Sequence, residues 1–180
     1  DKYFNVKVCV TAQHRQMLDQ VLRFFEIKPD IDLDIMKQEQ DLTLLTSAIL
    51  KKMKKIISEY NPDLVLVHGD TTTTFATAVA AFYSGVPVGQ VEAGLRTYDL
   101  HAPFPEEFNR QVASKVTRWH FSPTDSSRDN LLLERVKPDY ITVTGNTVID
   151  ALFWMLKRID SDPERRIALG AMLNEALSFQ

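Results

Sequence analysis

The feature that most restricts the fold is an uninterrupted apolar run, Leu64-Val65-Leu66-Val67. It follows Asn61-Pro62-Asp63, which is typical of a helix end, and polar residues come directly after it. A strand with one solvent-exposed face alternates apolar and polar residues, whereas a strand that is covered on both faces does not. The run therefore predicts a strand buried on both faces of a parallel sheet, and with it an α/β fold.

Strand-like and helix-like segments alternate along the rest of the chain, as judged from the spacing of their apolar residues. We predict strands at Val6–Val10, Ile31–Ile35, Leu64–Val67, Val86–Val91, Trp119–Phe121 and Ile141–Thr144. We predict helices at Gln13–Ile27, Leu42–Tyr60, Thr72–Ser84, Pro105–Val116, Asp125–Glu134 and Thr147–Ile159, and a last helix from Pro163. This order indicates a doubly wound, Rossmann-like parallel sheet over residues 1–160, followed by a helical tail over residues 161–180.

Composition argues against several classes of function. With 21 Lys and Arg against 24 Asp and Glu, the net charge is −3, so nothing attracts the whole chain to nucleic acid or an anionic membrane. A single cysteine cannot form an internal disulfide, and no apolar run approaches the roughly 20 residues of a membrane span. The histidines lack the spacing of a zinc site, and no P-loop or Gly-x-Ser-x-Gly motif occurs. We expect a soluble intracellular protein without a metal.

Polar residues gather where the predicted strands end. Segments that begin at His68, Glu92, Ser122 and Gly145 each follow such an end. In open α/β sheets, ligands bind beyond the carboxyl ends of the strands, and parallel strands bring these ends to one edge. The four segments therefore predict a binding site on one rim of the sheet.

Asp70 lies in the first of these segments, His68-Gly69-Asp70-Thr71-Thr72-Thr73-Thr74. One interpretation is that Asp70 caps the helix expected from Thr72, because aspartate and threonine both accept backbone N–H bonds there. Capping needs only one such residue, however. A row of hydroxyl groups and backbone amides at the positive end of a helix suits a sugar or phosphate ligand, which is the interpretation we favour.

Glu92 follows the predicted strand Val86–Val91 and precedes Ala93-Gly94. Glycine lets a backbone approach a ligand closely, so this position suits a carboxylate that acts on a bound molecule. The alternative interpretation is a buried ion pair between Glu92 and Arg96.

A third polar group follows Pro103-Phe104-Pro105, where Glu106, Asn109 and Arg110 share one helical face. The alternative interpretation is an acid in the first helical turn that simply pairs with Arg110. Together with Asp70 and Glu92, we interpret these residues as a third arm of the site.

These motifs, taken together, resemble those of one family, the non-hydrolysing UDP-N-acetylglucosamine 2-epimerases of bacteria. The matching segments are Val10–Arg15, Val67–Thr74, Val91–Thr97, Pro105–Glu107 with Asn109-Arg110, and Thr144–Thr147. The resemblance runs from about Val6 to about Leu156. It implies a GT-B-like fold of two facing Rossmann-like domains, of which this chain is one half. It also implies a cytoplasmic homodimer that binds a UDP-sugar and needs neither a redox cofactor nor a metal.

The resemblance implies an isomerase that interconverts UDP-N-acetylglucosamine and UDP-N-acetylmannosamine for polysaccharide synthesis. UDP is eliminated to give a 2-acetamidoglucal and is then added back with inversion at C2. By motif position, the catalytic residues are Asp70, Glu92 and Glu106, and the substrate-binding residues are Asp70, Glu92 and Arg110. The positions of Gln13, His14 and Gln16 match a regulatory UDP-sugar site; the alternative for these three is an ordinary helix start.

The chain also departs from the family pattern. The family begins with a strand and a Gly-Thr-Arg-Pro-Glu loop and ends with a second, uridine-binding domain. We expect both to be absent from this chain, so that it has little activity alone and exposes strand edge or apolar surface. Gln90 replaces a usual histidine, and Ala48 replaces an arginine of the regulatory site.

Two other functions stay open. One is that of the hydrolysing relatives, which release free N-acetylmannosamine and UDP. The other is a module that binds a sugar nucleotide or serves in assembly without chemistry.

Overall fold

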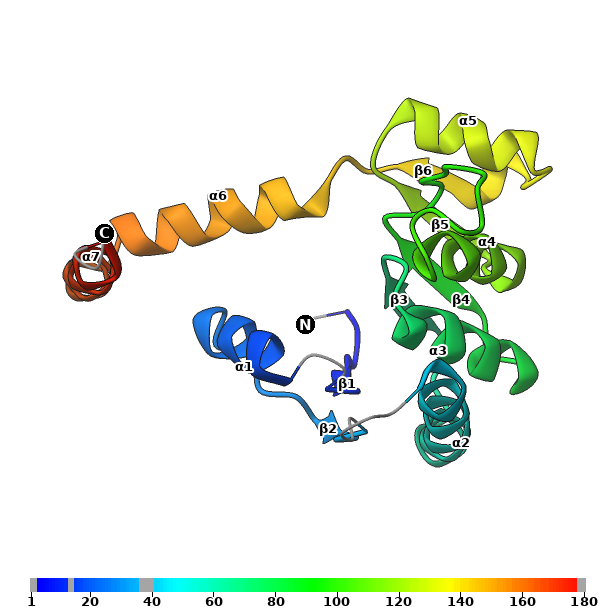
Figure 1. Cartoon of the computed structure of the whole chain (residues 1–180), viewed down its shortest axis with the longest axis horizontal. Coiled ribbons are helices and arrows are strands. Elements are labelled where there is room, and N and C mark those ends of the chain that lie inside the picture. Colours follow the sequence, from blue (N-terminus) through cyan, green and yellow to red (C-terminus); the bar gives the residue numbers. More distant parts are fainter. Residues whose placement is uncertain (1–2, 13–14, 36–40, 178–180) are drawn as a thin grey trace. The chain divides into compact units, whose positions relative to one another are not determined.

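The computed structural model describes residues 3–12, 15–35 and 41–177 (Figure 1). Its contacts divide the chain into two compact units, Asp1–Gly145 and Asn146–Gln180. The division falls after Gly145, earlier than the boundary at residue 160 that the helical pattern favours. All the candidate site residues in the described ranges belong to the first unit.

The first unit contains two parallel sheets. One pairs β1 (Cys9–Val10) with β2 (Ile31–Asp32), and the other has the order β3-β4-β5-β6. The strands of the larger sheet are β3 (Val65–His68), β4 (Val88–Val91), β5 (Trp119–Ser122) and β6 (Ile141–Val143). Every neighbouring pair in this sheet is parallel, so the carboxyl ends of its strands lie along one edge.

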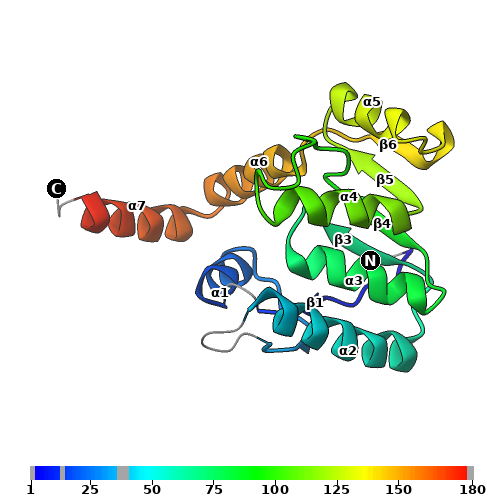
Figure 2. The ribbon, with the colours of Figure 1, turned by 45° about the vertical axis from the view of Figure 1, so that its right-hand side comes forward.

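Helices connect the strands in the order that the sequence predicts. They are α1 (Arg15–Phe24), α2 (Leu42–Tyr60), α3 (Thr72–Tyr83), α4 (Glu106–Val116) and α5 (Asp125–Leu133), with a short 3₁₀ turn, η1, at Pro138–Tyr140. Figure 2 shows α2, α3 and α4 side by side, and α3 and α4 contact the strands of the larger sheet. The fold is therefore α/β with parallel strands, as predicted.

A core of aliphatic side chains lies between these helices and the sheet. The side chains of Ile49 and Ile57 from α2 meet Ala76 and Ala80 of α3, and Val67 and Val88 supply the sheet side. Because alanine is small, α3 can lie close to both α2 and the strands.

The prediction that Leu64–Val67 is buried on both faces is wrong. Val67 faces the core and is 7% exposed, but Leu66 is 60% exposed. The helices cover the face that carries Val65 and Val67. Leu66 points to the opposite face, where its side chain covers Gly89. The apolar surface that we expected to be exposed is present on this face of β3.

The second unit consists of α6 (Thr147–Asp160) and α7 (Pro163–Leu177). Asn146 caps α6 by accepting a hydrogen bond from the backbone N–H of Val148 at 3.0 Å. Asp162 accepts one from the N–H of Arg165 at the start of α7, also at 3.0 Å. The predicted start of the last helix at Pro163 is therefore confirmed, and Asp162 is its cap.

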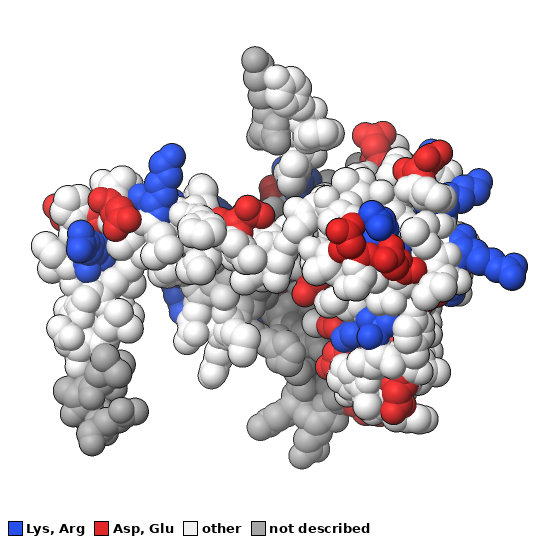
Figure 3. Space-filling view, turned by 90° about the horizontal axis from the view of Figure 1, so that it is seen from above, with Lys and Arg blue, Asp and Glu red and all other residues white. Residues whose placement is uncertain are grey.

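Over the described ranges, none of the helices combines the length and the hydrophobicity that crossing a membrane requires. Lys and Arg side chains lie beside Asp and Glu side chains on the face seen in Figure 3. This mixture agrees with the small net charge of −3.

Candidate active site

The ends of β3 and β4 bring the predicted residue Glu92 and its neighbour His68 to the same rim. His68 and Val91 are register partners in the sheet, so Glu92 lies one residue beyond β4 and close to the end of β3. Nε2 of His68 is 3.3 Å from Oε2 of Glu92, and the two side chains are 57% and 35% exposed. Both groups can therefore reach a ligand on the open rim.

The backbone of Glu92 adopts a left-handed conformation with φ of +64°. A side chain with a Cβ rarely adopts this conformation, and residues held in it cluster at functional sites. Gly69 also has a positive φ, and a Cβ there would lie 3.5 Å from Oε2 of Glu92. A Cβ at that distance would make only ordinary van der Waals contact, so the turn after β3 requires glycine for its positive φ and not for space.

The carboxylate of Asp70 is bound to α4. Its Oδ2 accepts a hydrogen bond from Nη2 of Arg110 at 2.6 Å, and its backbone carbonyl accepts one from Nδ2 of Asn109 at 2.9 Å. The Asp70 side chain is still 28% exposed. Asp70 is not the cap of α3, because the side chain of Thr71 accepts the hydrogen bond from Thr74 N at 3.3 Å. The capping interpretation of Asp70 is therefore wrong.

Glu106 is the first residue of α4 and is half-buried. Over residues 3–12, 15–35 and 41–177 its carboxylate has no hydrogen-bond or ion-pair partner. An acid of the first helical turn does pair with Arg110, as the alternative interpretation holds, but it is Glu107, at 3.3 Å, and not Glu106; Arg110 also pairs with Asp70. Glu107 takes this place because its side chain points into the protein, where Arg110 and two backbone N–H groups meet it.

The alternative ion pair between Glu92 and Arg96 is also wrong. Arg96 has no exposed side-chain surface and donates from Nε to Oε1 of Glu134 at 2.6 Å. It also donates from Nη2 to Oγ of Ser114 at 2.8 Å. Arg96 therefore joins the segment after Glu92 to α4 and to the C-terminal end of α5, and leaves the Glu92 carboxylate available on the rim.

The ion pair of Glu134 affects its ionisation. Burial raises the pKa of Glu134, but the hydrogen bonds and charges of Arg96 and Lys115 outweigh burial, and the pKa lies below its ordinary value. The carboxylate therefore stays ionised at neutral pH.

The proposed regulatory residues are only in part described. Gln16 is exposed in the first turn of α1, whereas Gln13 and His14 lie outside the described residues. In the described part of the chain, no three His, Cys, Asp or Glu side chains cluster as they would around a metal ion.

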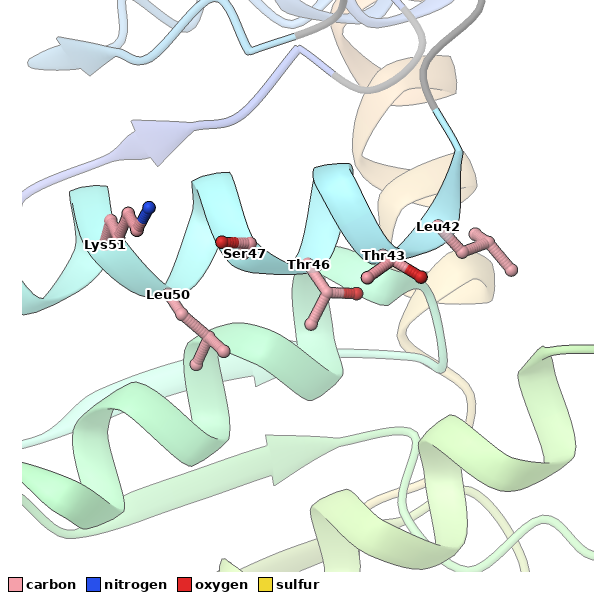
Figure 4. A pocket seen from close by; sticks show the side chains of 6 residues that line it. All are labelled: Leu42, Thr43, Thr46, Ser47, Leu50 and Lys51. Atoms are coloured by element: carbon pink, nitrogen blue, oxygen red, sulfur yellow. The ribbon is translucent and has the colours of Figure 1, made fainter.

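A hollow of about 610 Å³ runs along α2, and none of the candidate site residues lines it (Figure 4). Its lining consists of Leu42, Thr43, Thr46, Ser47, Leu50 and Lys51. The candidate site is therefore an open rim of strand ends, separate from this hollow.

Sequence reasoning gave no role to two residues that contact the site. His68 stands inside a quoted motif, and its position at the end of a predicted strand was the signal that could have identified it. Glu107 adjoins Glu106, and its spacing of three residues from Arg110 also allows an ion pair. Only the tertiary contacts of Glu107 distinguish the two glutamates.

Comparisons with known proteins identify the family of the chain. A family model described as UDP-N-acetylglucosamine 2-epimerase matches residues 1–177. Curated UDP-N-acetylglucosamine 2-epimerases from Yersinia pestis and Escherichia coli K12 are each 57% identical to the chain. The match with the Yersinia pestis protein covers 94% of this chain and 45% of that protein. The match with the Escherichia coli protein covers 95% of this chain and 46% of that protein.

Solved structures give the same result. The crystal structure of UDP-GlcNAc 2-epimerase from Neisseria meningitidis bound to UDP-GlcNAc has 49% identity and a TM-score of 0.90, covering 100% of this chain and 47% of that one. The Methanocaldococcus jannaschii enzyme in complex with UDP-GlcNAc and UDP has 31% identity and a TM-score of 0.82, covering 94% of this chain and 47% of that one.

These enzymes have the GT-B fold, and the chain spans about half the length of the curated relatives that it matches. The family model matches more than nine tenths of the chain, residues 1–177. The chain belongs to the UDP-N-acetylglucosamine 2-epimerase family.

Proposed function

We propose that this chain supplies the acid–base half of an enzyme that interconverts UDP-N-acetylglucosamine and UDP-N-acetylmannosamine. The observation that carries the proposal is the arrangement of Asp70 and Glu92 at the ends of adjacent strands. Asp70 is held by Arg110, and Glu92 stands in a left-handed conformation beside His68. Two relatives that are 57% identical to the chain are named UDP-N-acetylglucosamine 2-epimerase.

The chemistry requires more than one acid–base group. A base removes the C2 proton, and the electron pair of the C2–H bond forms a C1=C2 double bond. The C1–O bond breaks, and its electron pair leaves with UDP. In the return step a proton is delivered to the opposite face of C2, and the UDP oxygen adds to C1. One carboxylate cannot easily serve both faces of the ring. We assign the acid–base and sugar-contacting roles to Asp70, Glu92 and Glu106 as a set.

Arg110 contributes to substrate binding through Asp70. Its side chain is 12% exposed, and its Nη2 bonds the Asp70 carboxylate. In this arrangement Arg110 presents a fixed Asp70 oxygen to the sugar.

We propose further that Gln13, His14 and Gln16 contact a regulatory UDP-sugar, and that the enzyme works as a homodimer in the cytoplasm. Sedimentation velocity with and without UDP-sugar tests the dimer.

The experiment uses the protein expressed from its complete reading frame, with UDP-N-acetylglucosamine in D₂O. Proton NMR should detect UDP-N-acetylmannosamine that carries deuterium at C2, because the proton returned to C2 comes from solvent-exchanged groups. Glu92→Gln and Asp70→Asn should each lower kcat by roughly 10²–10⁴-fold, the usual contribution of a positioned acid or base. Glu59→Gln is the control, since Glu59 lies on α2 and is 55% exposed.

Other results would overturn the proposal in different ways. Release of free N-acetylmannosamine and UDP would assign the hydrolysing reaction. Binding of UDP-sugar without turnover by the wild-type protein would assign a binding module. Because the chain spans about half the length of its relatives, we expect the 180-residue chain alone to show little epimerase activity.

A further inference from the structure

A carboxylate with no exposed surface lies beneath the candidate site. Glu107, the second residue of α4, is 0% exposed. Its Oε1 accepts hydrogen bonds from the N–H of Tyr98 at 3.0 Å and from Nε2 of Gln111 at 2.8 Å. Its Oε2 accepts one from the N–H of Thr97 at 3.1 Å and lies 3.3 Å from Nη1 of Arg110. Both oxygens of this buried group are thus satisfied.

The environment keeps Glu107 ionised. Burial raises the pKa of Glu107, but the hydrogen bonds from Gln111, Thr97 and Tyr98 and the charge of Arg110 outweigh burial. The pKa therefore lies below its ordinary value. A buried negative charge next to Arg110 is the result.

One guanidinium links this buried charge to the rim. Nη1 of Arg110 faces Glu107, and Nη2 of Arg110 donates to Oδ2 of Asp70 at 2.6 Å. A planar guanidinium that is held at both terminal nitrogens has a fixed orientation. The position of the Asp70 carboxylate therefore depends on Glu107, although the two carboxylates contact different terminal nitrogens of Arg110.

The same carboxylate fixes a second part of the site. Thr97 and Tyr98 belong to the segment that connects Glu92 with α4, and their N–H groups are held by Glu107. Glu107 is thus bonded both to the backbone that follows Glu92 and, through Arg110, to Asp70.

We propose that Glu107 is a positioning residue for the epimerase reaction, acting through Arg110 on Asp70 and through Thr97 and Tyr98 on the Glu92 segment. The inference rests on the proposed function, because positioning is defined by the reaction. Glu107 does not touch the substrate, so its loss affects the placement of reacting groups more than binding. Displacement of a catalytic group by about 1 Å can cost about 10²-fold in rate.

The test is a kinetic cycle with Glu107→Gln, Arg110→Met and the double variant, in the protein from the complete reading frame. We expect Glu107→Gln to lower kcat about 10- to 100-fold while KM changes less than about threefold. In the Arg110→Met background the same change should lower kcat much less, because the link through Arg110 is already broken. If the fold-losses in kcat of the two single variants multiply fully in the double variant, the proposal is overturned. An unchanged kcat in Glu107→Gln would also overturn it.

A second variant covers the case in which Glu107→Gln does not fold. Arg110→Lys keeps the charge but has one nitrogen, which cannot hold Glu107 and Asp70 together. It should lower kcat while the thermal unfolding midpoint stays close to that of the wild type. A wild-type kcat in Arg110→Lys would show that bridging is not needed, and the proposal would fail.

A measurement without turnover separates this inference from the proposed function. In the wild-type protein the Arg110 guanidinium protons should give slowly exchanging NMR signals, and Glu107→Gln and Asp70→Asn should each speed their exchange. If the wild-type protein did not act on UDP-N-acetylglucosamine, the proposed function would fail. The NMR signals would still decide whether Glu107 fixes Arg110, and rapid exchange in the wild type would refute that link.

Discussion

The guanidinium of Arg96 lies against the carboxylate of Glu134, with Nε 2.6 Å from Oε1 and Nη2 3.2 Å from Oε2. The Arg96 side chain has no exposed surface, and Glu134 is 14% exposed. Arg96 follows the rim residue Glu92 by four positions, whereas Glu134 is the C-terminal cap of α5. The pair therefore fixes the segment after Glu92 to a helix that contributes none of the predicted site residues.

Glu134→Ala should destabilise the first unit strongly. The substitution leaves the Arg96 charge buried without its main partner, which typically costs about 3–5 kcal/mol. The free energy of unfolding, measured with urea at pH 7, should fall by about that amount.

Asp129→Ala is the matched control on the same helix. Asp129 pairs with Arg128, but the two side chains are 60% and 42% exposed. An exposed pair contributes about 1 kcal/mol or less, so this variant should unfold close to the wild type. Equal effects of the two substitutions would mean that the Arg96–Glu134 pair is solvated in solution.

The buried histidine His120 should make stability depend on pH. His120 is 1% exposed. Burial lowers its pKa from 6.5 to about 4, despite a hydrogen bond to the backbone of Thr117. The unfolded chain thus binds a proton at higher pH than the folded one. The contribution of His120 to the free energy of unfolding is therefore fully present above pH 6.5, and it is lost as the pH falls from 6.5 toward 4.

Urea unfolding at pH 7 and pH 5 checks this expectation. The wild-type protein should lose about 2 kcal/mol between these pH values through His120 alone. His120→Gln does not titrate, so its loss should be smaller by about the same amount. Between about pH 7.5 and pH 8.5 neither state is protonated, and the two proteins should change in parallel. Identical curves at pH 5–7 would mean that His120 is hydrated in the folded protein.

The limits of α2 could be predicted from sequence because both ends carry local signals. Asp41 accepts a hydrogen bond from Leu44 N at 2.7 Å, and Asn61 adopts a left-handed conformation at the other end. The first strand is different. Its predicted range was Val6–Val10, but only Cys9–Val10 pairs with β2. Strand pairing depends on a partner distant in sequence, which a local pattern does not specify.

The rim was predictable for a different reason. Parallel strands bring their carboxyl ends to one edge of a sheet, so Asp70 and Glu92 had to lie on the same rim once β3 and β4 were recognised. The partner of Arg110 was not predictable, because acids three and four residues away both fit on a helix. The backbone N–H groups of Thr97 and Tyr98 select Glu107. Exposure of Leu66 likewise depends on which face the helices cover.

Gly94→Ala should be one of the most damaging small substitutions in the loop after Glu92. Gly94 has a φ of +91°, and a Cβ there would lie 2.2 Å from the backbone oxygen of Ser127 in α5. The clash is with backbone, so α5 or the loop must move. Overpacking of this kind costs about 1–3 kcal/mol, in addition to about 1–2 kcal/mol for the left-handed conformation. Urea unfolding measures the sum.

Gly85→Ala separates the two contributions to the cost of Gly94→Ala. Gly85 also has a positive φ, of +73°, but a Cβ there would meet nothing within 4 Å. It should therefore cost only the conformational part, about 1–2 kcal/mol. The difference between the two variants measures how tightly the loop is held against α5. A difference near zero would mean that α5 yields freely. In that case Arg96–Glu134, with the hydrogen bond from Asn130 to the Gly94 carbonyl at 3.0 Å, would not fix the segment that carries Glu92.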